Sequence, residues 1–240
     1  MRSQFIYLKE SEFDKPIYKV LKFEYLHDMI SNKLNTLLNP KKWEDPYENL
    51  FLNSNVEFAS GTYLKSELGK SIFCQCWSFT KESDAMWRIY SPDYNSVKIS
   101  TTPRKLITSL LEINNDYNKT FIGKVKYIKS IDLKLLFELN AKNWVLEEGG
   151  LGHTKSLLHK RYPFKHENEI RLIHNTFTNA EREILKYEIS PNALIENIVF
   201  DPRIEYSKFK ERKQILRELG FTKTIVKSNL YKLPNYNSIK

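Results

Sequence analysis

Two glutamates separated by one residue, Glu167 and Glu169, are the strongest candidates for catalytic side chains in this sequence. In a strand, side chains two residues apart point to the same face, so both carboxylates could line one pocket. One carboxylate could stabilise positive charge that develops on a substrate, while the other deprotonates or orients an acceptor. Lys165 and Arg171 flank the pair. The alternative interpretation is therefore a solvated strand edge with paired surface charges.

Aromatic and polar side chains also gather in a helix predicted over 82–90, which contains Trp87, Arg88 and Tyr90. Trp87 and Tyr90 are three residues apart, so they would lie on the same side of this helix. They could face a ligand, or they could pack in the core. Ser78 ends the preceding aromatic-rich strand. A buried strand residue with one hydrogen bond is the alternative for this serine.

The segment 39–48 is a loop in which two prolines alternate with charged and aromatic side chains. Trp43 and Tyr47 could pin this loop to the domain or contact a substrate. Its carboxylates, Glu44, Asp45 and Glu48, offer an alternative chemistry, namely metal-dependent cleavage of nucleic acid. The loop therefore supplies the rival catalytic hypothesis.

Several common catalytic and metal-binding motifs are absent from the sequence. It contains no GxxxxGK[ST], GxGxxG, HExxH or GxSxG pattern, and its five histidines do not have metal-ligand spacing. Cys74 and Cys76 are predicted to be small buried side chains under a sheet, because no further cysteine or histidine cluster could complete a metal site. We therefore predict no metal centre.

The order of the predicted elements favours an α+β fold. Strands are predicted at 17–20, 71–79, 97–100, 121–128, 169–173, 184–189, 195–200 and 224–231, and helices at 23–32, 82–90, 103–111, 132–140, 154–160 and 205–219. The strands at 169–173 and 184–189 could pair through Thr178-Asn179. Because strands and helices do not alternate regularly, we expect a single domain over 1–240 with a mixed, mostly antiparallel sheet and flanking helices.

Composition and charge limit the class of protein. The chain has 240 residues and a net charge of +9, which favours a polyanionic partner such as nucleic acid or a phosphate-bearing cofactor. The helix at 205–219 carries a basic face, which is either solvated or a nucleic-acid patch. No apolar run approaches the ~20 residues of a membrane span. Two cysteines and an N-terminus without a signal peptide predict a cytoplasmic protein without membrane contact.

Four segments in order carry a family resemblance: Tyr18-Lys19, the loop 39–48, Cys76-Trp77-Ser78 with Met86-Trp87-Arg88-Ile89-Tyr90, and Lys160 followed by Glu167-Asn168-Glu169-Ile170-Arg171. This series resembles a bacterial family of unknown function that is grouped with AbiGi-type abortive-infection proteins, and the similarity spans about 17–200. The chain departs from the pattern at Ile89, where the family often has histidine, and at Ser100, where it often has an acidic residue.

The motif order is more remotely similar to that of ADP-ribosyltransferases, which place a polar residue on the first strand, a serine on a middle strand and a glutamate on a late strand. The resemblance implies that Tyr18 or Lys19, Ser78, and Glu167 with Glu169 fill these places and that NAD is the substrate. Glu169 would face the ribose, where cleavage builds positive charge. The aromatic rings of Tyr18, Trp87 and Tyr90 would stack on nicotinamide or adenine, and Lys19, Arg88 or Arg171 would face the pyrophosphate.

Three hypotheses follow for function. The leading one is a phage-defence or toxin-type effector that transfers ADP-ribose from NAD to a macromolecule such as nucleic acid. The second is the metal-dependent nuclease. The third is a non-catalytic nucleic-acid-binding or sensor module that works with a partner protein of a defence operon. Convergence of Lys19, Ser78, Trp87, Tyr90 and the two glutamates on one site would favour the first.

Overall fold

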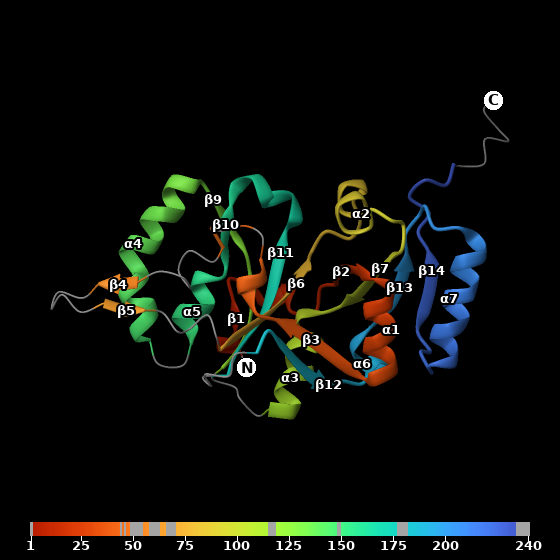
Figure 1. Cartoon of the computed structure of the whole chain (residues 1–240), viewed down its shortest axis with the longest axis horizontal. Coiled ribbons are helices and arrows are strands. Elements are labelled where there is room, and N and C mark those ends of the chain that lie inside the picture. Colours follow the sequence, from red (N-terminus) through yellow and green to blue (C-terminus); the bar gives the residue numbers. More distant parts are fainter. Residues whose placement is uncertain are drawn as a thin grey trace.

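The computed structural model of the chain describes residues 2–43, 45, 47–48, 55–57, 63–65, 71–114, 119–147, 150–176 and 182–233. Within these residues, ten strands form one mixed and mostly antiparallel sheet, with helices on both of its sides (Figure 1). The predicted α+β fold with a mostly antiparallel sheet is therefore confirmed. In the described part of the chain, no helix is both long and apolar enough to cross a membrane.

The main path of the sheet has the strand order β1-β8-β11-β6-β2-β7-β13-β14, and β3 joins β12 to β6 beside this path. Its strands are β1 (Phe5–Ile6), β2 (Ile17–Lys22), β3 (Leu34–Leu38), β6 (Ile72–Ser78), β7 (Ser96–Thr101), β8 (Thr120–Lys124), β11 (Glu169–Asn175), β12 (Ile184–Glu188), β13 (Asn197–Phe200) and β14 (Thr224–Lys227). Two smaller pairs are β9 (Lys126–Ile128) with β10 (His159–Arg161), and β4 (Asn55–Glu57) with β5 (Tyr63–Lys65).

The helices flank the sheet and its ends. They are α1 (Phe23–Asn32), α2 (Asp84–Tyr90), α3 (Pro103–Asn114), α4 (Ser130–Leu146), α5 (Leu151–Ser156), α6 (Pro191–Leu194) and α7 (Tyr206–Glu218), with short 3-10 helices η1 (Arg2–Gln4), η2 (Glu10–Glu12), η3 (Pro40–Lys42) and η5 (Tyr162–Glu167). Leu26, Met29 and Ile30 are buried on α1, as their helical spacing predicts. Gly220 has a φ of 84°, the left-handed conformation that glycine adopts after a helix end.

The two faces of the sheet are covered differently, and this difference positions the site. One face packs its apolar side chains, such as Trp77 and Leu172, into the main core with α1 and α3. The opposite face has a second cluster, in which Cys74 and Ile173 pack under α4 and α5. Further along that face α2 lies over β2 and lines a small pocket there (Figure 1). Ser78 of β6 and the paired Glu169 of β11 lie between these two helical groups.

Some sequence predictions of structure were wrong, and some strands were not predicted. The strands at 169–173 and 184–189 do not form a hairpin, because β11 pairs with β6 and β8 while β12 pairs with β3. The proposed turn, Thr178-Asn179, lies outside the described residues. The helix predicted over 154–160 ends at Ser156, and β10 follows it, since its residues pair in parallel with β9. β3 was not predicted, because its alternation is short and its partners are distant in sequence.

Candidate active site

A row of four polar residues crosses the middle of the sheet. Glu169 of β11 pairs with Ser78 of β6. Tyr18 of β2 pairs on one side with Ser78 and on the other with Ser100 of β7. Because paired residues of neighbouring strands project to the same face, these four side chains share the face that carries α2. The register alone therefore brings three of the predicted site residues into one line.

Glu169 is a buried and firmly ionised carboxylate. The residue is only 5% exposed, and its carboxylate accepts hydrogen bonds from Arg171 Nε at 2.9 Å and from Arg171 Nη2 at 2.8 Å. The Nζ of Lys160 adds a contact at 3.4 Å. Burial alone would raise the pKa of this carboxyl group, but the charges of Arg171 and Lys160 prevail and lower its pKa to about 2. Glu169 is therefore a fixed negative charge at any physiological pH.

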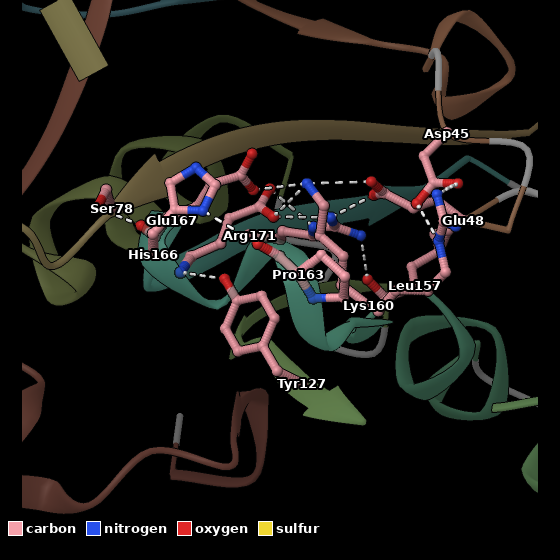
Figure 2. Close-up of polar contacts among 12 residues, drawn as sticks. Asp45, Glu48, Ser78, Tyr127, Leu157, Lys160, Pro163, His166, Glu167 and Arg171 are labelled. Carbon is pink, nitrogen blue, oxygen red and sulfur yellow. Dashed lines mark hydrogen bonds and ion pairs between the residues drawn. The ribbon is translucent and has the colours of Figure 1, made fainter. Parts of the chain in front are cut away.

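Glu167 reaches the same site by a route that the sequence did not predict. It is the last residue of η5 rather than a strand residue, and Asn168 follows in the left-handed conformation with a φ of 44°. The strand-based reason for pairing the two glutamates was therefore wrong. The Glu167 carboxylate nevertheless lies 2.6 Å from Lys160 Nζ, so both carboxylates contact one ammonium group (Figure 2).

The pKa of Glu167 moves in the opposite direction from that of Glu169. Burial raises the pKa of Glu167, and the nearby charges of Glu169 and Glu48 add to this effect, while Lys160 opposes it. A carboxyl group with a raised pKa holds a proton better, so Glu167 is the member of the pair that can exchange one. Two carboxylates whose environments separate their pKa values in this way are suited to different chemical roles. The pair is therefore no solvated strand edge.

Arg171 is a structural cation rather than a ligand-binding one. It is 1% exposed and is bound by Glu169 and Glu48, and its Nη1 donates to the main-chain oxygen of Leu157 at 2.6 Å. Its guanidinium also lies 4.2 Å from the ring centroid of Trp43. Figure 2 shows the contacts of Arg171 with Glu48 and Leu157. Since its donors are directed at protein groups, the prediction that Arg171 faces a pyrophosphate does not fit its surroundings.

The acidic loop is held by cations instead of presenting free metal ligands. Asp45 accepts from Arg161 at 3.0 Å and 3.2 Å. Glu48 binds Arg171, and it lies 3.1 Å from Lys160. Glu44 lies outside the described residues. In the ranges that the structure describes, no group of three or more potential metal ligands is found. Asp45 and Glu48 are thus committed to ion pairs, which disfavours the nuclease hypothesis.

Ser78 connects the glutamate-bearing segment to β6. Its hydroxyl donates to the main-chain oxygen of Glu167 at 2.5 Å and accepts from the N–H of Thr80 at 2.9 Å. It is buried, as the alternative interpretation of this serine expected. Because it holds the end of η5 against the sheet, Ser78 positions Glu167.

The residues of α2 divide between core and site. Trp87 is 1% exposed, and its Nε1 donates to Glu82 at 3.0 Å, so it is a packing residue. Tyr90 is 42% exposed, and its pKa is raised by burial and by the charge of Glu167, which places it near the carboxylates. Arg88 points elsewhere, because it pairs with Asp84 of its own helix at 2.8 Å and is largely exposed. Of these three predicted ligands, Tyr90 alone is both exposed and near the glutamates.

Lys19 leaves β2 on the opposite face from Tyr18, because successive side chains of a strand alternate. Burial lowers its pKa, while Cys76 and Glu169 oppose this shift. Lys19 therefore lies on the opposite side of the sheet from the polar row, within electrostatic range of Glu169. Of the two alternatives for the first-strand position, Tyr18 is the one that lies in the polar row.

Several contacts of the site were missed by sequence reasoning. Lys160 and Glu48 complete the charge network, Tyr127 accepts a hydrogen bond from the N–H of Glu169 at 2.8 Å, and Cys76 has a side-chain hydrogen bond with Glu169. Burial, followed by the charge of Glu169, raises the pKa of the Cys76 thiol. The nearest signal was the position of Lys160 in the motif series, where it was assigned to a helix.

The family comparison covers the same part of the chain. A family model described as "Protein of unknown function (DUF2971)" matches residues 86–172, which is less than half of the chain. This stretch contains most of α2, all of β10 and η5 and the start of β11, and so includes both glutamates. It supports the resemblance to a family of unknown function. The comparison with curated proteins gives no match.

Three solved structures of DarT from Thermus sp. 2.9 are similar to this chain. The complex with NAD+ is 11% identical, covers 92% of this chain and 97% of that chain, and has a TM-score of 0.42. The complex with carba-NAD+ is 12% identical, with the same coverage and a TM-score of 0.40. The complex with ADP-ribosylated ssDNA is 11% identical, covers 93% and 96%, and has a TM-score of 0.44. At this identity the likeness concerns the course of the chain alone.

Proposed function

We propose that this protein is a toxin-type ADP-ribosyltransferase that uses NAD and modifies nucleic acid. One observation carries the proposal: the buried carboxylate of Glu169, with a lowered pKa, and the partly buried carboxylate of Glu167, with a raised pKa, meet at one lysine beside the Ser78–Tyr18 row. The order of the motifs, with a polar residue, a serine and a late glutamate, supports the same reaction class.

The two carboxylates suit the two halves of such a transfer. Breaking the bond between nicotinamide and C1′ of the ribose sends the bonding electrons to nicotinamide and leaves positive charge on the sugar. Glu169, which is already ionised and fixed, stabilises that charge without rearrangement. The acceptor then forms a new bond to C1′ and loses a proton, which Glu167 takes up. The raised pKa of Glu167 favours this role.

Nucleic acid as acceptor is supported by the surface next to Glu167. Tyr162 of η5 is 54% exposed, and Lys165 Nζ lies 5.1 Å from its ring centroid. Arg161 lies 4.3 Å from the ring centroid of Tyr47, which is also exposed. Exposed rings can stack on unpaired bases, and the cations beside them can bind the phosphates. The basic face of α7, by contrast, lies at the far end of the sheet from β11 (Figure 1).

A role in phage defence remains part of this proposal and rests on the resemblance to abortive-infection proteins. Such an effector would act in the cytoplasm, and a partner protein of the same operon would restrain or trigger it. The site is compatible with a toxin, because its carboxylates are already oriented by Lys160, Arg171 and Ser78.

The direct test is transfer of labelled ADP-ribose from NAD to an oligonucleotide by the purified protein. Glu169→Gln should lower the rate of transfer by about 100-fold or more, which is the usual effect of removing one preorganised electrostatic group from an enzyme active site. Glu188→Gln, an exposed change on β12, is the matched control and should keep full activity. The thermal midpoint of each variant separates lost chemistry from lost folding. A wild-type protein that neither binds nor consumes NAD would overturn the proposal and favour a non-catalytic binding module.

A further inference from the structure

A small pocket beside the polar row has the chemistry of an anion site. It lies between β2, β7 and α2, and its lining includes Tyr18, Ser78, Thr80, Lys81, Ser83 and Lys98. Four hydroxyl groups and two ammonium groups therefore surround it. Glu82 is the carboxylate of the same lining, so the charged side chains of the pocket sum to one positive charge. Hydroxyl and ammonium donors in this arrangement are typical partners of a phosphate oxygen.

Lys98 is the central cation of this pocket. It pairs with Val20 in the β2–β7 ladder, so it projects to the same face as Tyr18 and the rest of the polar row. Its side chain is buried, and its Nζ lies 5.7 Å from the ring centroids of both Tyr18 and Trp87. Its ion pair with Glu82 spans 3.2 Å. The lysine is thus held in one place by two rings and one carboxylate.

The other cations near the row are unsuitable for a phosphate. Arg171 and Lys160 are bound by the carboxylates of the active site. Arg88 pairs with Asp84 on an exposed face of α2, and Lys19 projects to the opposite side of the sheet. Of the cations near the row within the described residues, Lys98 and Lys81 are the two that line the pocket.

A second and independent observation comes from Ser100. This residue is in register with Tyr18 and lies two positions from Lys98 on the same face of β7. Its hydroxyl is buried and has no hydrogen-bond partner within the described part of the chain. A buried hydroxyl without a partner is costly, so such a group often serves a ligand or a bound water. Ser100 is not part of the pocket lining, but it is the cross-strand neighbour of Tyr18, so its hydroxyl is a donor for a ligand that extends past Tyr18 along the polar row.

We propose that the pocket around Lys98 binds a phosphate of the dinucleotide substrate, with Lys98 as its main cation and the hydroxyls of Thr80 and Ser83 as further donors. This inference rests on the proposed function for the identity of the ligand. Glu82 forms an ion pair with Lys98 when the pocket is empty, so it competes with the phosphate for this lysine. Tyr18 and Ser78 belong to both the pocket and the polar row, so a bound diphosphate would extend from the glutamates toward α2.

The test compares ADP with adenosine, which lacks the phosphates, by isothermal titration calorimetry on the full chain. The wild type should bind ADP more tightly than adenosine. Lys98→Met should weaken ADP binding by about tenfold or more, since a hydrogen bond to a charged group is lost, and should leave adenosine binding unchanged. Lys98→Arg should keep most of the preference for ADP. Lys134→Met on the exposed face of α4 is the matched control.

Glu82→Gln should increase the affinity for ADP. This increase is not expected if Lys98 has a structural role alone. The amide still accepts from Trp87 and Ser228 but no longer neutralises Lys98, so ADP should bind more tightly than to the wild type. The inference would be overturned if folded Lys98→Met kept the wild-type ratio of ADP affinity to adenosine affinity. It would also be overturned if the wild type bound ADP no more tightly than adenosine. NAD consumption by the wild type, measured separately, tests the proposed function. A Lys98-dependent preference for ADP without NAD consumption would contradict that function alone.

Discussion

Lys160 Nζ lies 2.6 Å from the carboxylate of Glu167, and this ion pair joins β10 to the end of η5. The same ammonium contacts the buried carboxylates of Glu169 and Glu48, so one lysine compensates three carboxylates. Glu169 has a second cation in Arg171, whereas Glu167 depends on Lys160. The chemical difference between the two glutamates therefore comes from how the cations are distributed between them.

Removing this lysine should shift the pH dependence of transfer. Lys160 lowers the pKa of Glu167 against burial and against the charges of Glu169 and Glu48. In Lys160→Met the pKa of Glu167 should therefore rise further, and the acidic limb of the pH–rate profile should move to higher pH. Lys134→Met, an exposed lysine of α4, should leave the profile unchanged. An unshifted acidic limb in Lys160→Met would show that Glu167 is not the group that takes up the proton.

The backbone at Asn168 should control the position of Glu167. Asn168 has a φ of 44°, which glycine and asparagine tolerate and β-branched residues do not. Asn168→Gly should keep both stability and transfer. Asn168→Val should destabilise the fold by about 1–2 kcal/mol and reduce transfer, because η5 must shift to relieve the strain. Urea denaturation and the transfer assay measure the two effects, and equal activity of both variants would refute this role of the turn.

Sequence reasoning was most successful where local periodicity decides structure. The helix predicted over 23–32 matches α1, because its apolar residues recur at helical spacing and pack on β2 and β3. β3 and β10 were missed, because each is short and depends on partners far away in the sequence. No local pattern distinguishes such a strand from a loop or a helix end.

The candidate site shows the same limit. Glu167 and Glu169 were found from their spacing and from the motif series, but the reason offered for their convergence was wrong. The partners of Arg171 could not be predicted, since Glu48 lies 123 positions away in the sequence. Lys98 gave no motif signal at all. Its importance follows from the register of β7 against β2, which only the folded sheet defines.

Arg171 should be among the most costly residues to replace. It is buried against Glu169 and Glu48, so Arg171→Met leaves two carboxylates in the interior with one fewer cation. Breaking a buried pair in this way costs about 3–5 kcal/mol. Arg88→Met removes an exposed pair with Asp84 within one helix and should cost much less stability than Arg171→Met. Denaturant midpoints of the two variants give this comparison, and similar losses would contradict the buried network.

The lowered pKa of Glu169 makes a stability prediction of its own. The pKa of this carboxyl group is about 2 in the folded protein, against 4.5 for an unperturbed glutamate. The unfolded chain therefore takes up the proton first as the pH falls, and the stability due to this group is present above pH 4.5 and is lost as the pH falls toward about 2.

Glu169→Gln has no such ionisable group. The difference in unfolding free energy between wild type and Glu169→Gln should thus be largest near neutral pH and shrink as the solution is acidified through this window. Urea denaturation of both proteins at a series of pH values measures it, with Glu188→Gln as an exposed control that should follow the wild type. A difference that stays constant from neutral pH down to the acid limit of folding would mean that Arg171 and Lys160 do not hold Glu169 in its ionised form.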